Sequence, residues 1–137
     1  MWVLDKTKTA MGKRLIRTWL EQPLLSPAGI TLRQNAVEEL FENRPLLDDV
    51  TEALTGIFDL ERIMTRVVYG SVNGKDLRAL WSALTRLPQL KALSATFKAT
   101  MLRDIDSRMD VLSDICALID RAVVEEPPHT IREGGII

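Results

Sequence analysis

The sequence predicts an all-α fold of about six or seven helices that ends in a short extended tail. Apolar residues make up 46% of the 137 residues and recur at three- and four-residue steps, as on one face of a helix. Gly and Pro are scarce, with 7 and 6 copies, which argues against a loop-rich chain. No alternation of apolar and polar side chains, the pattern of a half-buried strand, occurs before residues 131–137.

The first predicted helix follows Thr9 and ends before Pro23. The Thr9 hydroxyl can cap the helix start, and proline cannot continue a helix. Met11, Leu15 and Trp19 are spaced four apart and therefore share one face. We expect this face to lie in the core, so that Trp19→Ala costs about 3–5 kcal/mol of folding free energy.

The next stripes lie between recognisable start and stop signals. Ser26 followed by Pro27 is a capping side chain with proline at the first helical position. The stripe that follows is broken at residues 43–45 (Asn-Arg-Pro). Further stripes cover residues 46–58 and 60–69, so each of these stretches is predicted to be helical.

The second half of the chain repeats this pattern. A turn cluster at residues 71–74 precedes a helix that Asn73 or Asp76 caps. A stripe over residues 87–97 follows, and one long helix over about residues 100–125 completes the helical part. Across all stripes, the residues assigned to the structural core are Met11, Leu15, Trp19, Leu60, Ile63, Leu80 and Trp81.

Charge is balanced overall but uneven along the chain. The 18 Lys and Arg against 19 Asp and Glu give a net charge of −1, which argues against a strongly basic nucleic-acid-binding protein. Residues 1–33 carry six basic and two acidic groups (+4), and residues 103–137 carry four basic and eight acidic groups (−4). Solvated helix faces are the usual explanation, and phosphate or interdomain contacts are the alternative. The candidates for such contacts are Lys6, Lys8, Lys13, Arg14 and Arg17.

The sequence assigns no catalytic, cofactor-binding or metal-binding residue. The lone Cys116 lies on an apolar stripe and the lone His129 lies in the tail, so a Cys–His pair is not expected. Asp106 and Asp110 could meet a cation, although a solvated helix face explains them better. No phosphate-binding loop, signal peptide or membrane-spanning run occurs. We therefore expect a cytoplasmic, non-catalytic domain with no membrane partner.

Three segments carry a family resemblance. The first has the pattern Asp-x-Thr-x-Thr-x-x-Gly-x-Arg-Leu from Asp5, followed by Trp-Leu and Pro-Leu. The second has Asp-Leu-Glu-Arg from Asp59, then a small-residue turn and Asp-Leu at Asp76. The third has Arg-Ala-Val from Arg121, then Pro-Pro and Arg-Glu-Gly-Gly-Ile-Ile. In this order and spacing they resemble the MutS family of bacterial DNA mismatch-repair proteins, in the first segment of its core (lever) domain.

The resemblance implies a multi-helical core/lever domain over residues 1–126 and a linker over 127–137 toward a clamp domain that is missing here. It also implies that the sequence is a piece of a longer chain with connector, clamp and ATPase domains. The parent would use ATP and magnesium, bind mismatched double-stranded DNA through its other domains, act as a homodimer and meet other mismatch-repair proteins. This piece would be a scaffold coupling the clamp to the ATPase domain. The alternative is a free-standing helical adaptor that binds another protein.

Overall fold

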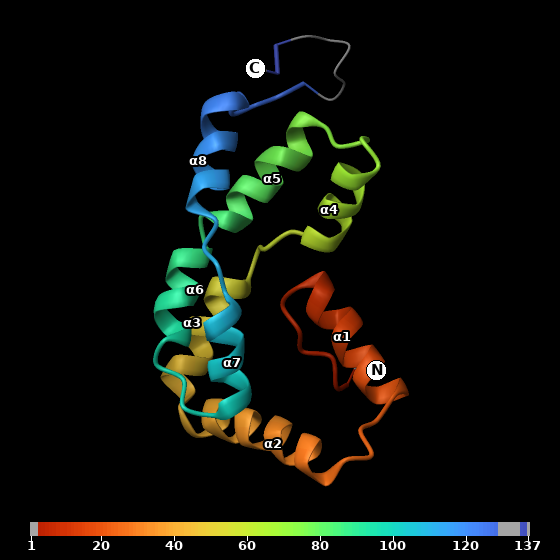
Figure 1. The fold of residues 1–137 in the computed structure, drawn as a ribbon, viewed down its shortest axis with the longest axis vertical. Helices are drawn as coiled ribbons and strands as arrows, with labels where there is room; N and C mark the ends of the chain where they lie inside the picture. Colours follow the sequence, from red (N-terminus) through yellow and green to blue (C-terminus); the bar gives the residue numbers. More distant parts are fainter. Residues whose placement is uncertain (1–2, 129–134, 137) are drawn as a thin grey trace.

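The computed structural model describes residues 3–128, 135 and 136, and within them the chain forms eight helices and no strand (Figure 1). The predicted all-α class is confirmed, with one helix more than the upper predicted number. In chain order the helices are α1 (Ala10–Glu21), α2 (Pro27–Glu42), α3 (Arg44–Leu54), α4 (Leu60–Val68), α5 (Gly74–Leu84), α6 (Leu87–Ser94), α7 (Thr100–Arg108) and α8 (Ser113–Ala122).

Several helices begin at the predicted capping residues. The Thr9 hydroxyl accepts a hydrogen bond of 3.0 Å from a first-turn N–H of α1, and Ser26 caps α2 in the same way. At the start of α5, the Asn73 side chain accepts from the Asp76 N–H, and the Asp76 carboxylate accepts from the Asn73 N–H. These bonds satisfy donors that the first turn of a helix leaves unpaired.

The long helix predicted over residues 100–125 is wrong, because the chain breaks between α7 and α8. Leu112 has a left-handed backbone with φ of 49°, which ends helical geometry there. The Asp110 carboxylate accepts a 2.9 Å hydrogen bond from the Leu112 N–H. A short acidic side chain that binds nearby backbone competes with the helix for that donor. The apolar spacing runs through the break, so periodicity alone did not show it.

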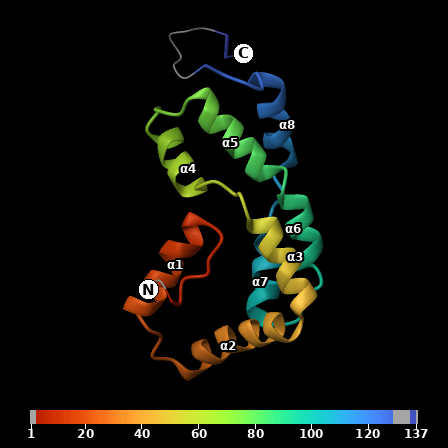
Figure 2. The same cartoon turned by 180° about the vertical axis from the view of Figure 1, so that it is seen from behind.

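The helices form two groups along the length of an elongated molecule (Figure 1). We call α4, α5 and α8 the α5 group, in which α5 packs on both α4 and α8. We call α2, α3, α6 and α7 the α3 group, in which α2 packs on α3 and α7, and α6 on α3 and α7. Helix α1 lies to one side, between α4 and α2, as Figures 1 and 2 both show.

Each group has its own buried residues. In the α5 group, Leu84 of α5 contacts Ile119 of α8 and Val123, which directly follows α8. All three are at most 6% exposed. Around them pack Leu77, Leu80, Trp81, Leu87, Cys116, Ala122 and Ile136. In the α3 group, the buried apolar residues are Ala36, Leu46, Ala53, Leu90 and Leu102. The apolar burial that stabilises the chain is therefore divided between the two groups.

The seven residues predicted to lie in the core differ in how deeply the structure buries them. Ile63 is buried, but the core prediction is wrong for Leu15, which is 51% exposed. No residue of α1 is buried, because α1 packs along none of the other helices in the described part of the chain. The remaining predicted core residues are half-buried: Met11, Trp19, Leu60, Leu80 and Trp81.

The end of the chain returns to the start of α5. The Val124 N–H donates a 3.0 Å hydrogen bond to the Ile136 carbonyl, and Pro127 is buried against Gly74. Of the predicted extended segment over residues 131–137, residues 131–134 and 137 lie outside the described residues, and the domain boundary at residue 127 stays a prediction. Among the helices described, none is long and apolar enough to cross a membrane.

Candidate functional site

The predicted basic residues near the N-terminus do not form one cluster. Lys13 lies 3.8 Å from the Asp5 carboxylate, and Arg17 lies 4.0 Å from Glu21, one helical turn away. In both pairs the basic side chain is exposed, at 69% for Lys13 and 64% for Arg17, so each pair contributes little to stability. Lys6 and Lys8 are exposed and precede α1. The structure brings only Arg14 of this set to a distant part of the chain.

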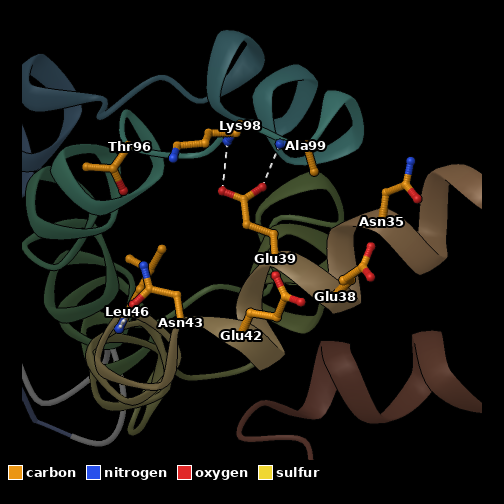
Figure 3. A pocket seen from close by; sticks show the side chains of 9 residues that line it. All are labelled: Asn35, Glu38, Glu39, Glu42, Asn43, Leu46, Thr96, Lys98 and Ala99. Atoms are coloured by element: carbon orange, nitrogen blue, oxygen red, sulfur yellow. Dashed lines mark hydrogen bonds between the residues drawn. The ribbon is translucent and has the colours of Figure 1, made fainter.

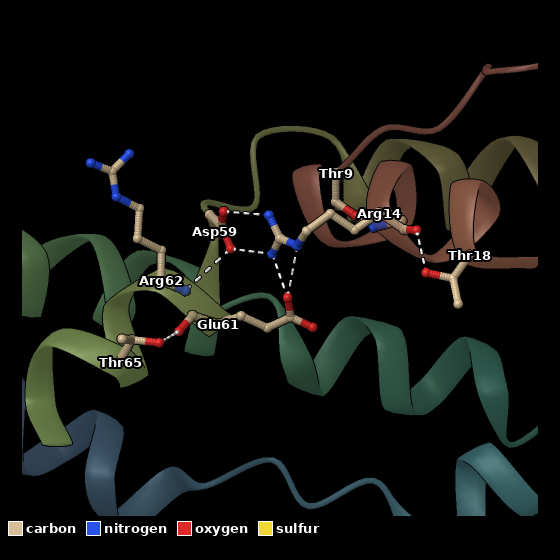
Figure 4. Close-up of polar contacts among 8 residues, drawn as sticks. Thr9, Arg14, Thr18, Asp59, Glu61, Arg62 and Thr65 are labelled. Atoms are coloured by element: carbon tan, nitrogen blue, oxygen red, sulfur yellow. Dashed lines mark hydrogen bonds and ion pairs between the residues drawn. The ribbon is translucent and has the colours of Figure 1, made fainter. Parts of the chain in front are cut away.

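Arg14 joins α1 to the start of α4 (Figure 4). Its Nη1 and Nη2 donate to the two Asp59 carboxylate oxygens at 2.8 and 2.7 Å, and its Nε donates to Glu61 at 2.9 Å. This two-pronged geometry matches a guanidinium to a carboxylate and is stronger than a single contact. Asp59 also caps α4 by accepting from the Arg62 N–H at 3.3 Å. One carboxylate thus positions both helices.

The hydrogen bonds between Arg14 and Asp59 shift the pKa values of both residues. The Arg14 hydrogen bonds hold the pKa of the Asp59 carboxyl below its usual range, and desolvation opposes this shift only in part. The same bonds to Asp59 and Glu61 raise the pKa of Arg14. A charged pair that stabilises both ionised forms shifts the two pKa values in opposite directions. Arg14 and Asp59 are therefore both ionised at neutral pH.

The other end of α1 meets α2 through an aromatic contact. The Arg33 guanidinium lies 3.5 Å from the centre of the Trp19 ring. Beside this pair lies an open groove of about 610 Å³, floored by Val37 and Phe41, which are 64% and 69% exposed. The half-buried Trp19 ring therefore joins α1 to α2 through a cation–π contact.

A second pocket lies where α2 and α3 face the loop before α7, as Figure 3 shows. It has a volume of about 800 Å³, and Glu39 projects across it. The Glu39 carboxylate accepts hydrogen bonds from the backbone N–H groups of Lys98 and Ala99, at 2.8 and 2.5 Å. Ala99 has no side chain that could cap α7. Glu39 instead accepts from the N–H of the N-cap residue itself, the bond that an N3 Glu makes in a capping box, from a helix about 60 residues earlier in the chain. No sequence spacing could show this contact.

Further ion pairs join neighbouring helices within each group. Arg66 of α4 binds Asp76 of α5 at 2.7 Å, and Lys91 of α6 binds Asp106 of α7 at 3.0 Å. The Arg62 side chain points away from the Arg14 contacts in Figure 4. The Asp106 carboxylate thus pairs with the Lys91 ammonium. The described residues contain no group of three or more His, Cys, Asp or Glu that could hold a metal ion.

Taken together, the polar side chains that reach across the structure join helices. Arg78 of α5 donates to Asp120 of α8 at 3.0 Å and to the Val124 carbonyl at 2.8 Å, which ties the tail to the α5 group. Cys116 is half-buried in the α5 group, and His129 lies outside the described residues. This arrangement can position helices relative to one another, and sequence reasoning missed it because most partners lie more than 40 residues apart.

Comparison with known proteins gives one consistent family. The model of MutS domain III matches residues 1–137. The DNA mismatch repair protein MutS of Ruminiclostridium cellulolyticum is 45% identical over all 137 residues, and that of Lachnoclostridium phytofermentans is 47% identical over the same length. The chain spans 16% and 15% of the length of these curated relatives. The chain therefore belongs to the MutS domain III family and is homologous to one segment of bacterial MutS.

Proposed function

We propose that this chain is the helical lever of a DNA mismatch-repair protein, coupling mismatched-DNA binding by a clamp domain to an ATPase domain. The observation that carries the proposal is the match of the whole chain to MutS domain III. The chain itself performs no catalysis in this account. Binding of DNA, ATP and magnesium belongs to the other domains of the parent, which acts as a cytoplasmic homodimer with other mismatch-repair proteins.

The architecture supports this role. Two helical groups, each with its own buried apolar residues, are arranged along the length of the molecule. A body of this kind can carry a displacement from one end to the other if the groups move as units. Coupling between the ends is then reciprocal. If nucleotide binding shifts the groups and so changes the affinity for DNA, DNA binding must change the affinity for nucleotide by the same factor.

The alternative of a free-standing adaptor has weaker support. An adaptor needs an apolar surface for a partner, and the groove beside Trp19 offers one. The chain spans only 15–16% of the length of its relatives. This favours a role in which the exposed apolar helix faces contact the rest of a longer protein.

The test replaces the matching segment of the Ruminiclostridium cellulolyticum MutS with this chain. The chimera should hydrolyse ATP at a rate that differs between mismatched and fully paired duplexes, as we expect of the relative. The isolated chain should hydrolyse no ATP and show no preference for a mismatched duplex in a gel-shift measurement. ATPase activity or mismatch preference in the isolated chain would refute the proposal, as would a chimera that binds DNA but has lost the response.

A further inference from the structure

The two helical groups are joined at a narrow waist. The chain passes between them three times, at residues 55–59, 85–86 and 109–112. Two residues of these segments have left-handed backbone: Gly56, with φ of 82°, and Leu112, with φ of 49°. Such values are uncommon outside glycine, and they mark places where the chain changes direction sharply. Residues 55–59 and 109–112 are therefore bent backbone, whereas Thr85 and Arg86 keep right-handed helical backbone angles between α5 and α6.

Helix α1 spans this waist from outside. Its Arg14 binds Asp59 and Glu61 at the start of α4, which belongs to the α5 group. Its Trp19 contacts Arg33 of α2, which belongs to the α3 group. Figures 1 and 2 place α1 between these two helices from opposite viewpoints. A helix fixed at both ends to bodies joined by bent segments restricts how those bodies can move.

We propose that α1 is a strut that holds the α5 group and the α3 group at a fixed angle across the waist, and that the Arg14 contacts are its releasable end. This inference goes beyond the lever function and does not depend on it. It concerns the shape of this chain alone, whether or not that shape serves DNA repair.

The exposure of the contacts explains why this end releases. The side chains of Arg14 and Glu61 are 48% and 66% exposed, and that of Asp59 is 25% exposed. Salt screens attraction between such exposed charges, whereas it acts little on the stacked Trp19–Arg33 pair. The strut should therefore open first at Arg14.

Asp59 is the residue of the α5 group from which Arg14 is released when the strut opens. Its carboxylate holds Arg14 and also caps the first turn of α4. The substitution Asp59→Asn keeps an oxygen for the cap, because Asn is a good capping residue, but removes the charge that binds Arg14. This variant separates loss of the strut from loss of the helix start.

The experiment measures the distance between the groups in the 137-residue chain. Nitroxide labels are placed at Asp48→Cys in α3 and Arg121→Cys in α8, both exposed, with Cys116→Ala in the background. Electron–electron double resonance should give one narrow distance distribution. The distribution should broaden at least about twofold with Arg14→Gln and with Asp59→Asn, and also in the unsubstituted background when salt rises from about 0.05 to 1 M.

The matched control is Arg17→Gln, which removes an exposed arginine from the same helix and should leave the distribution unchanged. Amide exchange in α5 and α8 shows whether each variant remains folded; it should stay within about twofold of the parent, while exchange in α1 speeds up at least tenfold. An unchanged distribution in Asp59→Asn and at high salt would overturn the strut. Equal broadening with Arg17→Gln would overturn the role of Arg14.

Discussion

At the scale of single residues, carboxylates near helix starts link one helix to another. Asp59 caps α4 and binds Arg14, and Asp76 completes the cap of α5 and binds Arg66. Glu39 provides the third case, since it caps α7 from a different helix altogether. Each carboxylate satisfies unpaired backbone donors and also fixes the position of a second element.

Glu39→Ala should lower the free energy of unfolding by about 1–2 kcal/mol, because the start of α7 then loses its only side-chain acceptor in the described structure. The matched control is Glu38→Ala, which removes an exposed glutamate from the same pocket. Urea denaturation measures both variants. A similar loss in the control would show that general charge, and not the cap, is responsible.

Gly74→Ala should destabilise the chain by about 1–3 kcal/mol through overpacking. A methyl group there would lie 2.6 Å from Pro127 Cβ, a ring atom that cannot turn aside. The control is Gly29→Ala in α2, where the nearest atom is the end of the flexible Leu24 side chain at 3.2 Å. That control should be neutral or slightly stabilising, since Ala favours helix. Thermal melts that rank the two variants in the opposite order would contradict the packing of the tail on α5.

Asp106 should make stability depend on acid pH. Its hydrogen bonds with Ser94 and then Lys91 hold the pKa of the Asp106 carboxyl below its usual 3.8. Because the folded pKa is lowered, the stabilising effect is complete above the unfolded value and is lost as pH falls through the folded value. The denaturation midpoints of the wild type and Asp106→Asn should therefore differ at pH 7 and converge as pH falls through the folded pKa of Asp106. A difference that persists in acid would mean that the carboxylate charge is not the cause.

At the scale of helices, the sequence predicts most starts and some ends. The caps at Thr9, Ser26 and Asn73 were predicted because capping depends on residues within one turn. The break at Leu112 was missed because the apolar spacing continues across it. For the candidate site, the sequence named Arg14 among five basic residues but not its partners, because Asp59 lies 45 residues away and only the fold brings it near.

Helix α1 shows the limit of periodicity most directly. Its apolar stripe predicts one buried face, but the structure leaves the helix without any buried residue. For the half-buried Trp19 ring we expect Trp19→Ala to cost about 1–2 kcal/mol, from the lost cation–π contact and partial apolar burial, instead of the 3–5 kcal/mol of a core ring. Chemical denaturation of the 137-residue chain distinguishes these values. A loss above about 3 kcal/mol would mean that the ring is buried after all.

At the scale of the whole molecule, the division into two groups gives the proposed lever its working parts. The α5 and α3 groups each have their own buried apolar residues, and two of the three segments that join them at the waist are bent. Groups that move as units transmit a displacement only while the connection between them stays short and defined. Transmission of a displacement through the lever therefore depends on the waist more than on either group.

The most direct measurement compares two insertions of three glycines in the chimera with the Ruminiclostridium cellulolyticum MutS. One insertion lies in the waist, between Met109 and Asp110, and the control lies in the exposed turn between Ser71 and Val72, within the α5 group. The waist insertion should abolish the difference in ATPase rate between mismatched and paired duplexes while DNA binding and ATPase without DNA persist, and the control should keep that difference. A waist insertion that keeps the difference would contradict the lever.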